Sequence, residues 1–297
     1  MLMLDVIVYD EQFRDLIDLD QDMEDEGDYG GFLEGLIWSE KNKDLIFNTL
    51  GNKKTWRFYS KDRYELIKEE TNIANGMTYD RDENIIICEQ IGYRMARTDR
   101  NFSFYEIIAD SYDGKMFNSP NDVVVHSNGT VYFTDPHYGR RPTRHGRFSR
   151  QPQKKQRVYG IHPHDNSVFI ATEETNTPNG LCFSLDEKQV YFSETTTSEI
   201  SVMDVSDDGT FTNRRVLAVT PELGHGGPDG IKLDSEGNIW CCAQGGIQVY
   251  CPDGRLLGLL KTPAASGNLC FGGDDGHTLF MGADSHLVSV RTKTKRP

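Results

Sequence analysis

Five oxygen-donor side chains recur along the sequence, each at the head of a short apolar segment. The six segments start at Glu34, Asn75, Asn121, Asn179, Asp229 and Gly267, at intervals of 41, 46, 58, 50 and 38 residues. If these positions meet in space, the carboxylates of Glu34 and Asp229 repel each other unless a cation lies between them. Carboxylate and amide oxygens without a cysteine or histidine cluster select a hard ion. The pattern therefore predicts one divalent metal site, with Ca²⁺ as the first choice and Mg²⁺, Mn²⁺ or Zn²⁺ as alternatives.

A plainer explanation of these positions is that Asn-Gly and Asp-Gly dipeptides form tight turns. That explanation is adequate for any one segment taken alone. It weakens across the whole set, because the same position varies between Asn, Asp and Glu, and Glu is a poor turn former. We therefore interpret the repeated position as a ring of side chains around a common axis.

Most of these segments are followed by a turn cluster and a second β-rich run, which together predict a β-hairpin. Examples are Ser127–Thr130 before Val131–Thr134 and Asp234–Asn238 before Ile239–Cys242. A period of about 40 to 50 residues with roughly four strands per unit is typical of a β-propeller, so six units predict six blades. The alternative all-β architecture, a large sandwich or barrel, does not explain why one polar position heads each unit.

The whole chain, residues 1–297, is expected to form a single propeller domain with a central metal site. The N-terminal segment, residues 1–30, is expected to pack on the ring or to close it. Within that segment, the apolar run Val6–Tyr9 is the strand expected to add to the last blade. No strong helical periodicity appears beyond a turn near residues 10–18.

The second strand of each inner hairpin returns to the same mouth of the propeller, so its last residues are expected to line the pocket. This places Gln90, His137 and Tyr138 beside the ring as substrate contacts. Asp135 and Glu194 end two of these second strands, and we expect them to support the site from behind. For His137 and Tyr138 the alternative is a surface position on a turn.

The composition favours a small-molecule partner. A formal charge of −14, from 46 acidic and 32 basic residues, argues against nucleic acid or an anionic membrane as a partner. No segment approaches the roughly 20 apolar residues that span a bilayer, and the first residues have no basic n-region, so no secretory leader is expected. The six cysteines lie mostly in apolar runs and are interpreted as buried free thiols, which favours a cytoplasmic location. The sequence leaves the oligomeric state open.

One segment departs from the acidic average of the chain. Between Pro136 and His164 there are eight basic residues and no acidic residue. Residues 140–157, which carry all eight, are expected to form a solvated or subunit-contacting loop. The alternative is a cationic lid that attracts an anionic substrate.

As a set, these motifs resemble the SMP-30/gluconolactonase/regucalcin-like family, which includes the squid-type diisopropyl fluorophosphatase. The motifs are Leu33–Trp38, Ala74–Tyr79, Ser119–Val125, Phe133–Gly139, Thr177–Leu181 and Gly227–Ile231, and they look closest to gluconolactonases. The resemblance covers nearly the whole chain and implies a six-bladed propeller whose catalytic ion is held by Glu34, Asn179 and Asp229. It also implies that Asn121 is a further ligand or substrate contact, that Asp229 is the base or nucleophile, and that Asp122 is a supporting acid.

The predicted reaction is hydrolysis of a small, sugar-type lactone. The ion polarises the lactone carbonyl while water attacks, and Asp229 takes a proton from that water. The chain has no Gly-x-Ser-x-Gly elbow and no glycine-rich phosphate loop, which agrees with this chemistry. Where the family often has a histidine the chain has Gln90, so the identity of the lactone stays open. Two alternatives remain, phosphotriester hydrolysis at the same metal and a non-enzymatic calcium-binding propeller.

Overall fold

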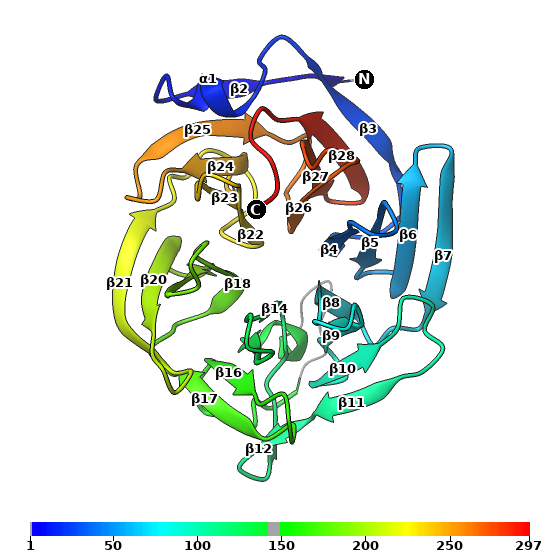
Figure 1. Cartoon of the computed structure of the whole chain (residues 1–297), viewed down its shortest axis with the longest axis vertical. Helices are drawn as coiled ribbons and strands as arrows, with labels where there is room; N and C mark the ends of the chain where they lie inside the picture. Colours follow the sequence, from blue (N-terminus) through cyan, green and yellow to red (C-terminus); the bar gives the residue numbers. More distant parts are fainter. Residues whose placement is uncertain (1, 142–148) are drawn as a thin grey trace.

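The computed structural model, which describes residues 2–141 and 149–297, is a ring of six antiparallel β-sheets around a central axis (Figure 1). Each sheet has four or five strands, and the sheets follow one another around the ring in chain order. The predicted six-bladed β-propeller is therefore confirmed. Each blade begins with its innermost strand beside the axis, as the position of the polar residue at the head of each repeat requires.

The blades are numbered here in chain order, with their strands given from the axis outwards. Blade 1 contains β4 (Leu33–Ser39), β5 (Asp44–Thr49), β6 (Lys54–Ser60) and β7 (Arg63–Glu69), and blade 2 contains β8 (Ala74–Tyr79), β9 (Ile85–Glu89), β10 (Arg94–Thr98) and β11 (Glu106–Ala109). Blade 3 contains β14 (Val123–Val125), β15 (Val131–Asp135), β16 (Arg157–Ile161) and β17 (Val168–Thr172), and blade 4 contains β18 (Pro178–Phe183), β19 (Gln189–Glu194), β20 (Glu199–Val205) and β21 (Phe211–Val219). Blade 5 contains β22 (Ile231–Leu233), β23 (Ile239–Ala243), β24 (Gly246–Tyr250) and β25 (Leu256–Lys261), and blade 6 contains β26 (Leu269–Gly272), β27 (Thr278–Ala283) and β28 (His286–Arg291).

β3 (Asp22–Asp28) is the fourth strand of blade 6, beside β28. The remaining elements are short and lie outside this four-strand pattern. They are β1 (Leu2–Met3), β2 (Val6–Val8), α1 (Phe13–Leu16), the ribbon of β12 (Ser111–Tyr112) and β13 (Lys115–Met116), and the 3₁₀ turn η1 (Tyr138–Arg140). Among the described residues, no helix has the length and apolar character needed to cross a membrane. All six cysteines are free thiols, as predicted, and all are buried except Cys270, which is partly exposed.

In blades 2 and 5, the turn inside the inner hairpin is held by an aspartate side chain at its first position, Asp80 and Asp234. In blade 5, one carboxylate oxygen of Asp234 accepts hydrogen bonds from the backbone N–H groups of Glu236 and Asn238, both at 2.9 Å. The other oxygen accepts a bond from the Trp240 indole at 3.0 Å. An aspartate that bonds the backbone two residues ahead stabilises a turn at low entropic cost, which is why the predicted turn cluster gives a hairpin here.

The apolar core of the protein lies between neighbouring blades rather than at one centre. Between blades 2 and 3, for example, the fully buried ring of Phe133 meets Phe117 edge to face, with ring centroids 5.0 Å apart. Cys88 and Met95 of blade 2 pack into the same cluster. Burying one side chain of this size contributes about 1.5–3 kcal/mol. Because each blade packs on both of its neighbours, the blades hold the inner strands in a fixed ring.

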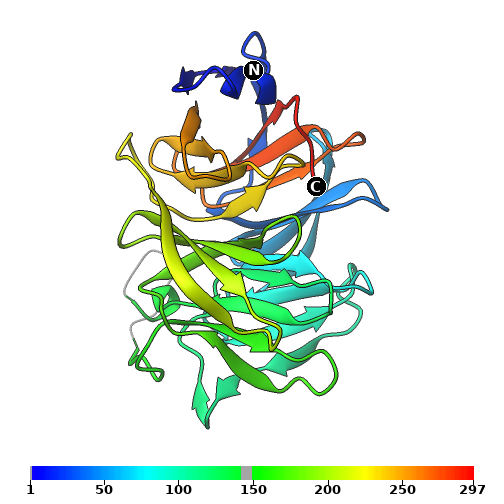
Figure 2. The same ribbon diagram turned by 60° about the vertical axis from the view of Figure 1, so that its left-hand side comes forward.

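The N-terminal segment, dark blue in Figure 2, lies beside the orange and red strands of the last two blades. It closes the ring through a different strand from the one expected. The expected run Val6–Tyr9 contributes β2, which adds to the outer edge of blade 5, where Val6 pairs with Leu260. The strand that completes blade 6 is instead β3, whose Glu24 lies opposite Ser289 of β28. The prediction for Val6–Tyr9 was therefore wrong. The acidic β3 sequence carries little apolar alternation, because a strand near the outer edge of its blade is held mainly by backbone hydrogen bonds and is partly exposed to solvent.

Candidate functional site

The inner strands of neighbouring blades approach each other closely at the glycines that follow four of the ring residues, Gly35, Gly76, Gly180 and Gly230. The backbone N–H of Gly76 donates to the carbonyl of Asn121 at 2.7 Å. A Cβ atom at Gly180 would lie only 2.4 Å from the carbonyl oxygen of Asp229. Glycine is therefore required where one strand bonds or packs against the next. The Asn-Gly and Asp-Gly dipeptides serve this close approach between blades, which the alternative of simple tight turns does not explain.

These strands bring the predicted polar residues together at one cavity of about 220 Å³. The residues that line it are Phe32, Glu34, Leu50, Asn75, Gln90, Asn121, Tyr138, Asn179, Thr195 and Asp229. All four predicted metal ligands are among them, together with two of the predicted substrate contacts, Gln90 and Tyr138. The lining residues come from five of the six blades, so the propeller as a whole is needed to assemble the site.

Side chains around the cavity fix the groups that face it. The Asn268 amide donates to Glu34 Oε2 at 3.1 Å. The amide of Asn179 donates to the hydroxyl of Thr195 at 3.0 Å, and that hydroxyl donates to the carbonyl of Pro228 at 2.7 Å. These bonds hold a carboxylate and an amide in place before any ligand enters. Sequence reasoning missed Asn268, although it stands where four of the other five repeats have glycine.

The two carboxylates of the cavity destabilise each other's charge. Burial, together with the negative charge of Asp122, raises the pKa of Glu34 to about 8. Burial also raises the pKa of Asp229 well above its usual value, with added contributions from Glu34 and Asp122. A hydrogen bond from Asn179 acts in the opposite direction but does not compensate. Negative charge concentrated in a buried cavity favours a bound cation.

Asn75 adds a further oxygen to this set. Its amide N–H donates to Gln90 Oε1 at 2.7 Å, while its own Oδ1 is buried and has no hydrogen-bond partner among the described residues. A buried acceptor left unpaired is costly, so this atom is suited to a donor or cation that enters the cavity. Sequence reasoning placed Asn75 in the ring but gave it no role. Its place in the repeat was the pattern that marked it.

The donors of the cavity suit a hard divalent ion. Glu34 and Asp229 supply carboxylate oxygens, while Asn121 and Asn179 supply amides. Hard ions such as Ca²⁺ prefer this oxygen-only set. Within residues 2–141 and 149–297, no group of three or more His, Cys, Asp and Glu side chains is arranged to hold a metal. Amide oxygens therefore make up the set, which distinguishes it from a typical zinc site.

Asp135 lies behind the cavity, where it fixes the segment that leads into Asn121. Its carboxylate accepts hydrogen bonds from the backbone N–H groups of Asn118 at 2.8 Å and Ser119 at 2.7 Å. The side chain is fully buried, and burial raises its pKa to about 7. Asp135 therefore has no direct contact with the cavity and acts by holding a loop.

Glu194 has the same arrangement in the next blade. Its carboxylate accepts hydrogen bonds from the backbone N–H groups of Asn176 at 3.1 Å and Thr177 at 2.7 Å. These residues lead directly into Asn179 of the ring. Burial raises the pKa of Glu194, partly offset by these backbone donors. The two acids at the ends of the second strands thus share one structural role, which the repeat made predictable.

The two preferred substrate contacts occupy different positions. Tyr138 lines the cavity, and burial raises the pKa of its hydroxyl above the usual range. His137 is not among the lining residues; its backbone N–H and its ring Nδ1 contact the side chain of Gln156. Burial lowers the pKa of His137, and the charge of Arg141 lowers it further. His137 therefore lies beside the cavity as a neutral imidazole that braces a neighbouring loop.

Three of the six described basic residues of 140–157, Arg140, Lys155 and Arg157, are bound to the protein itself. The guanidinium of Arg140 donates to the carbonyl of Phe117 at 2.7 Å and stacks over the Tyr93 ring at 3.6 Å. Lys155 and Arg157 both pair with Glu173, at 2.6 and 3.1 Å. Arg144 and Arg147 lie outside the described residues. For Arg140, Lys155 and Arg157, the contacts favour the expected loop over a cationic lid.

Residues 32–284 match the family described as the SMP-30/Gluconolactonase/LRE-like region. A gluconolactonase from Zymomonas mobilis is 34 % identical over 230 residues, an alignment that covers 74 % of this chain and 64 % of that protein. The chain thus spans less than two thirds of that relative's length. The pentonolactonase XacC of Haloferax volcanii is 27 % identical over 261 residues, which cover 84 % of this chain and 80 % of that protein.

The solved structure of a gluconolactonase from Xanthomonas campestris has the same fold over almost its whole length. The two superpose with a TM-score of 0.90 and 27 % identity, over 98 % of this chain and 97 % of that one. The family match extends from the first ring residue, Glu34, past the last, Gly267. The chain therefore belongs to the SMP-30/gluconolactonase/LRE-like family.

Proposed function

We propose that the protein is a lactonase that opens a small, sugar-type lactone at one divalent ion. Glu34, Asn121, Asn179 and Asp229 would hold the ion, with Ca²⁺ as the first choice. The observation that carries the proposal is the convergence of these four oxygen donors on one cavity, where the two carboxylates have raised pKa values. The gluconolactonase and pentonolactonase among the relatives support the choice of substrate class.

The cavity size supports a small substrate. Its volume of about 220 Å³ is below the ~300–1,000 Å³ typical of pockets for drug-sized ligands. Phe32 and Leu50 give it an apolar wall against which the carbon face of a sugar ring can pack. Tyr138, Gln90 and Asn75 present polar groups on the remaining wall, where they can bind ring hydroxyls.

When bound, the divalent ion supplies a Lewis acid that polarises the lactone carbonyl. Asp229 then acts as the base: its carboxylate takes a proton from the attacking water as the oxygen bonds to the carbonyl carbon. The ring C–O bond breaks, and the proton held on Asp229 passes to the departing ring oxygen, which leaves an open hydroxy acid. The Asn179 and Asn268 amides hold the two carboxylates in position during these steps.

A continuous pH-indicator assay tests the proposal. Glucono-1,5-lactone and a panel of other lactones are supplied to protein treated with EDTA, and then to the same protein with Ca²⁺, Mg²⁺, Mn²⁺ or Zn²⁺ restored. We expect acid release to fall to the uncatalysed rate with EDTA and to return with one or more ions. If metal binds but no lactone is opened, the proposal is wrong, and a phosphotriester substrate or a binding role becomes the better explanation.

Replacement of Tyr138 with phenylalanine tests whether the pocket recognises substrate hydroxyls. Loss of one neutral hydrogen bond costs about 0.5–1.5 kcal/mol, so we expect KM for glucono-1,5-lactone to rise roughly three- to tenfold. The ring hydroxyls are absent from δ-valerolactone, so its KM should change little. Initial rates with both lactones give the ratio of the KM of the variant to the KM of the wild type. An equal change for the two substrates would show that Tyr138 shapes the cavity without contacting hydroxyls.

A further inference from the structure

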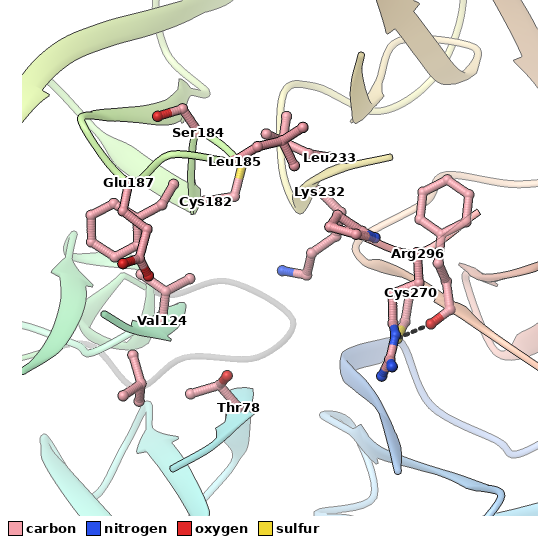
Figure 3. A pocket seen from close by; sticks show the side chains of 14 residues that line it. Thr78, Val124, Cys182, Ser184, Leu185, Glu187, Lys232, Leu233, Cys270 and Arg296 are labelled. Carbon is pink, nitrogen blue, oxygen red and sulfur yellow. Dashed lines mark hydrogen bonds between the residues drawn. The ribbon is translucent and has the colours of Figure 1, made fainter. Parts of the chain in front are cut away.

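A second cavity, of about 420 Å³, lies further along the same inner strands (Figure 3). The residues three positions after each ring residue are Ile37, Thr78, Val124, Cys182, Lys232 and Cys270, and all but Ile37 line this cavity. Only one of the six, Lys232, carries a charge. Figure 3 shows its side chain extending from β22 into the cavity. The next layer of the propeller behind the proposed metal site thus contains one lysine in otherwise neutral surroundings.

The ammonium group of Lys232 faces the metal-site layer through Asp122. Its Nζ lies 3.8 Å from Asp122 Oδ2. Asp122 directly follows the ring residue Asn121, at the position where four of the other repeats have glycine, so its carboxylate lies beside the ring. It also accepts a hydrogen bond from the backbone N–H of Val123 at 2.9 Å. Lys232 and Asp122 therefore link the two layers.

Lys232 keeps its charge in this position. Burial is the largest effect on its pKa and acts to lower it, but Asp122 and the neighbouring cysteines together act more strongly in the opposite direction, and the pKa is raised above its usual value. The thiols beside it are neutral, because burial raises the pKa of Cys182 to about 12 and that of Cys270 to about 11. Glu187 and Arg296 line the outer part of the cavity and pair with His126 and Glu40. Lys232 is thus the residue of this layer whose charge acts electrostatically on the ring residues.

The charges of the two layers can be counted. Glu34, Asp122 and Asp229 interact with one another electrostatically, and Lys232 also acts on Glu34. The proposed ligands Glu34 and Asp229 bind a metal in their ionised form, and Asp122 is the carboxylate that pairs with Lys232. Three carboxylates and one ammonium leave two negative charges, which one divalent ion balances.

We propose that Lys232 sets the charge selectivity of the central site, so that the site is matched to a divalent cation and not to a trivalent one. The inference rests on the metal site of the proposed function and assigns Lys232 as a positioning residue that acts through Asp122. Its ammonium repels any cation in the ring, and this repulsion grows with the charge of the ion. Removing the ammonium should therefore strengthen the binding of a trivalent ion more than that of a divalent ion.

Four proteins test this inference by direct binding: wild type, Lys232→Met, Asp122→Asn and the double variant. Calorimetry measures Ca²⁺ affinity, and sensitised luminescence measures Tb³⁺ affinity. We expect Lys232→Met to raise Ca²⁺ affinity roughly tenfold and Tb³⁺ affinity by more, and Asp122→Asn to weaken both. The double variant restores the original net charge, so both affinities should return to within about threefold of wild type.

Two controls separate charge from fold. Lys232→Arg keeps the positive charge and should preserve the Ca²⁺ to Tb³⁺ affinity ratio of the wild type. Lys41→Met removes a lysine from an exposed ion pair with Glu83, where screening makes the charge nearly silent, and should change neither affinity. If Lys232→Met does not fold, as judged by circular dichroism, Lys232→Gln takes its place.

Unchanged affinities in the neutral Lys232 variants would overturn the inference, as would a double variant as tight for Tb³⁺ as Lys232→Met alone. A wild-type protein that binds neither ion would overturn the metal site and the inference together. If the wild type binds metal and the variants show the expected shifts in affinity, but the wild type opens no lactone, the proposed function alone is contradicted.

Discussion

Replacing Asp229 with asparagine is expected to lower the lactonase turnover of the metal-saturated protein by roughly a thousandfold or more. The change removes the base that takes the proton of the attacking water, and base catalysis alone contributes about 10²–10⁴-fold. It also removes one of the two negative charges that face the ion, so metal affinity should fall. Turnover is measured with the pH-indicator assay at a metal concentration that saturates the variant. Binding is measured separately by calorimetry.

Glu34→Gln is the partner variant, because it removes a charge from the same cavity without removing the proposed base. We expect it to lose metal affinity comparably but to keep more turnover once saturated with metal. Asp208→Asn, at an exposed turn outside the cavity, is the matched control and should keep wild-type activity. Wild-type rates in either Asp229→Asn or Glu34→Gln would contradict the assignment of the site.

Removal of residues 2–28 is expected to prevent the protein from folding to a stable monomer. The deletion leaves the outer edge of β28 unpaired, because β3 is its partner in blade 6. It also removes the fully buried side chains of Phe13, Leu16 and Ile17. Each contributes about 1.5–3 kcal/mol, and their sum rivals the ~5–15 kcal/mol of net stability typical of a folded protein. Circular dichroism melts and size-exclusion chromatography measure the outcome.

The control for this deletion removes residues 2 and 3 alone. Leu2 and Met3 are 39 % and 87 % exposed, so their loss should shift the melting temperature by no more than about 2 °C. Adding a synthetic peptide of residues 1–30 to the longer deletion should restore a cooperative melt. A deletion of residues 2–28 that stays monomeric and melts like the full chain would show that the ring does not depend on β3.

Much of the fold could be predicted because the inner strands carry strong constraints. The interval between Asn75 and Asn121, or between Asn179 and Asp229, equals the length of one blade. The glycine after most ring residues is needed where two inner strands approach closely. Such constraints are local in sequence. Because the repeat occurs six times, the sequence predicts both the ring residues and the number of blades.

The features that escaped prediction depend on contacts between distant residues. The acidic strand β3 has no apolar pattern, and only its pairing with β28 makes it a strand. Whether His137 reaches the cavity depends on its bond to Gln156 across a loop. The unpaired oxygen of Asn75 follows from the side chain of Gln90, which takes up its N–H. Rotamer choices of this kind are set by packing, which a sequence pattern does not contain.

The pairing of β3 with β28 also bears on how the chain reaches its folded state. More than 250 residues separate the two strands, so the ring has long-range contacts that are slow to form. During synthesis β3 emerges early and its partner β28 emerges last, so the edge of β3 that pairs with β28 stays unpaired until then. Its run of Asp22, Glu24, Asp25, Glu26 and Asp28 repels other chains during that interval. The same acidic residues that leave β3 without a hydrophobic pattern would thus protect the nascent chain against aggregation.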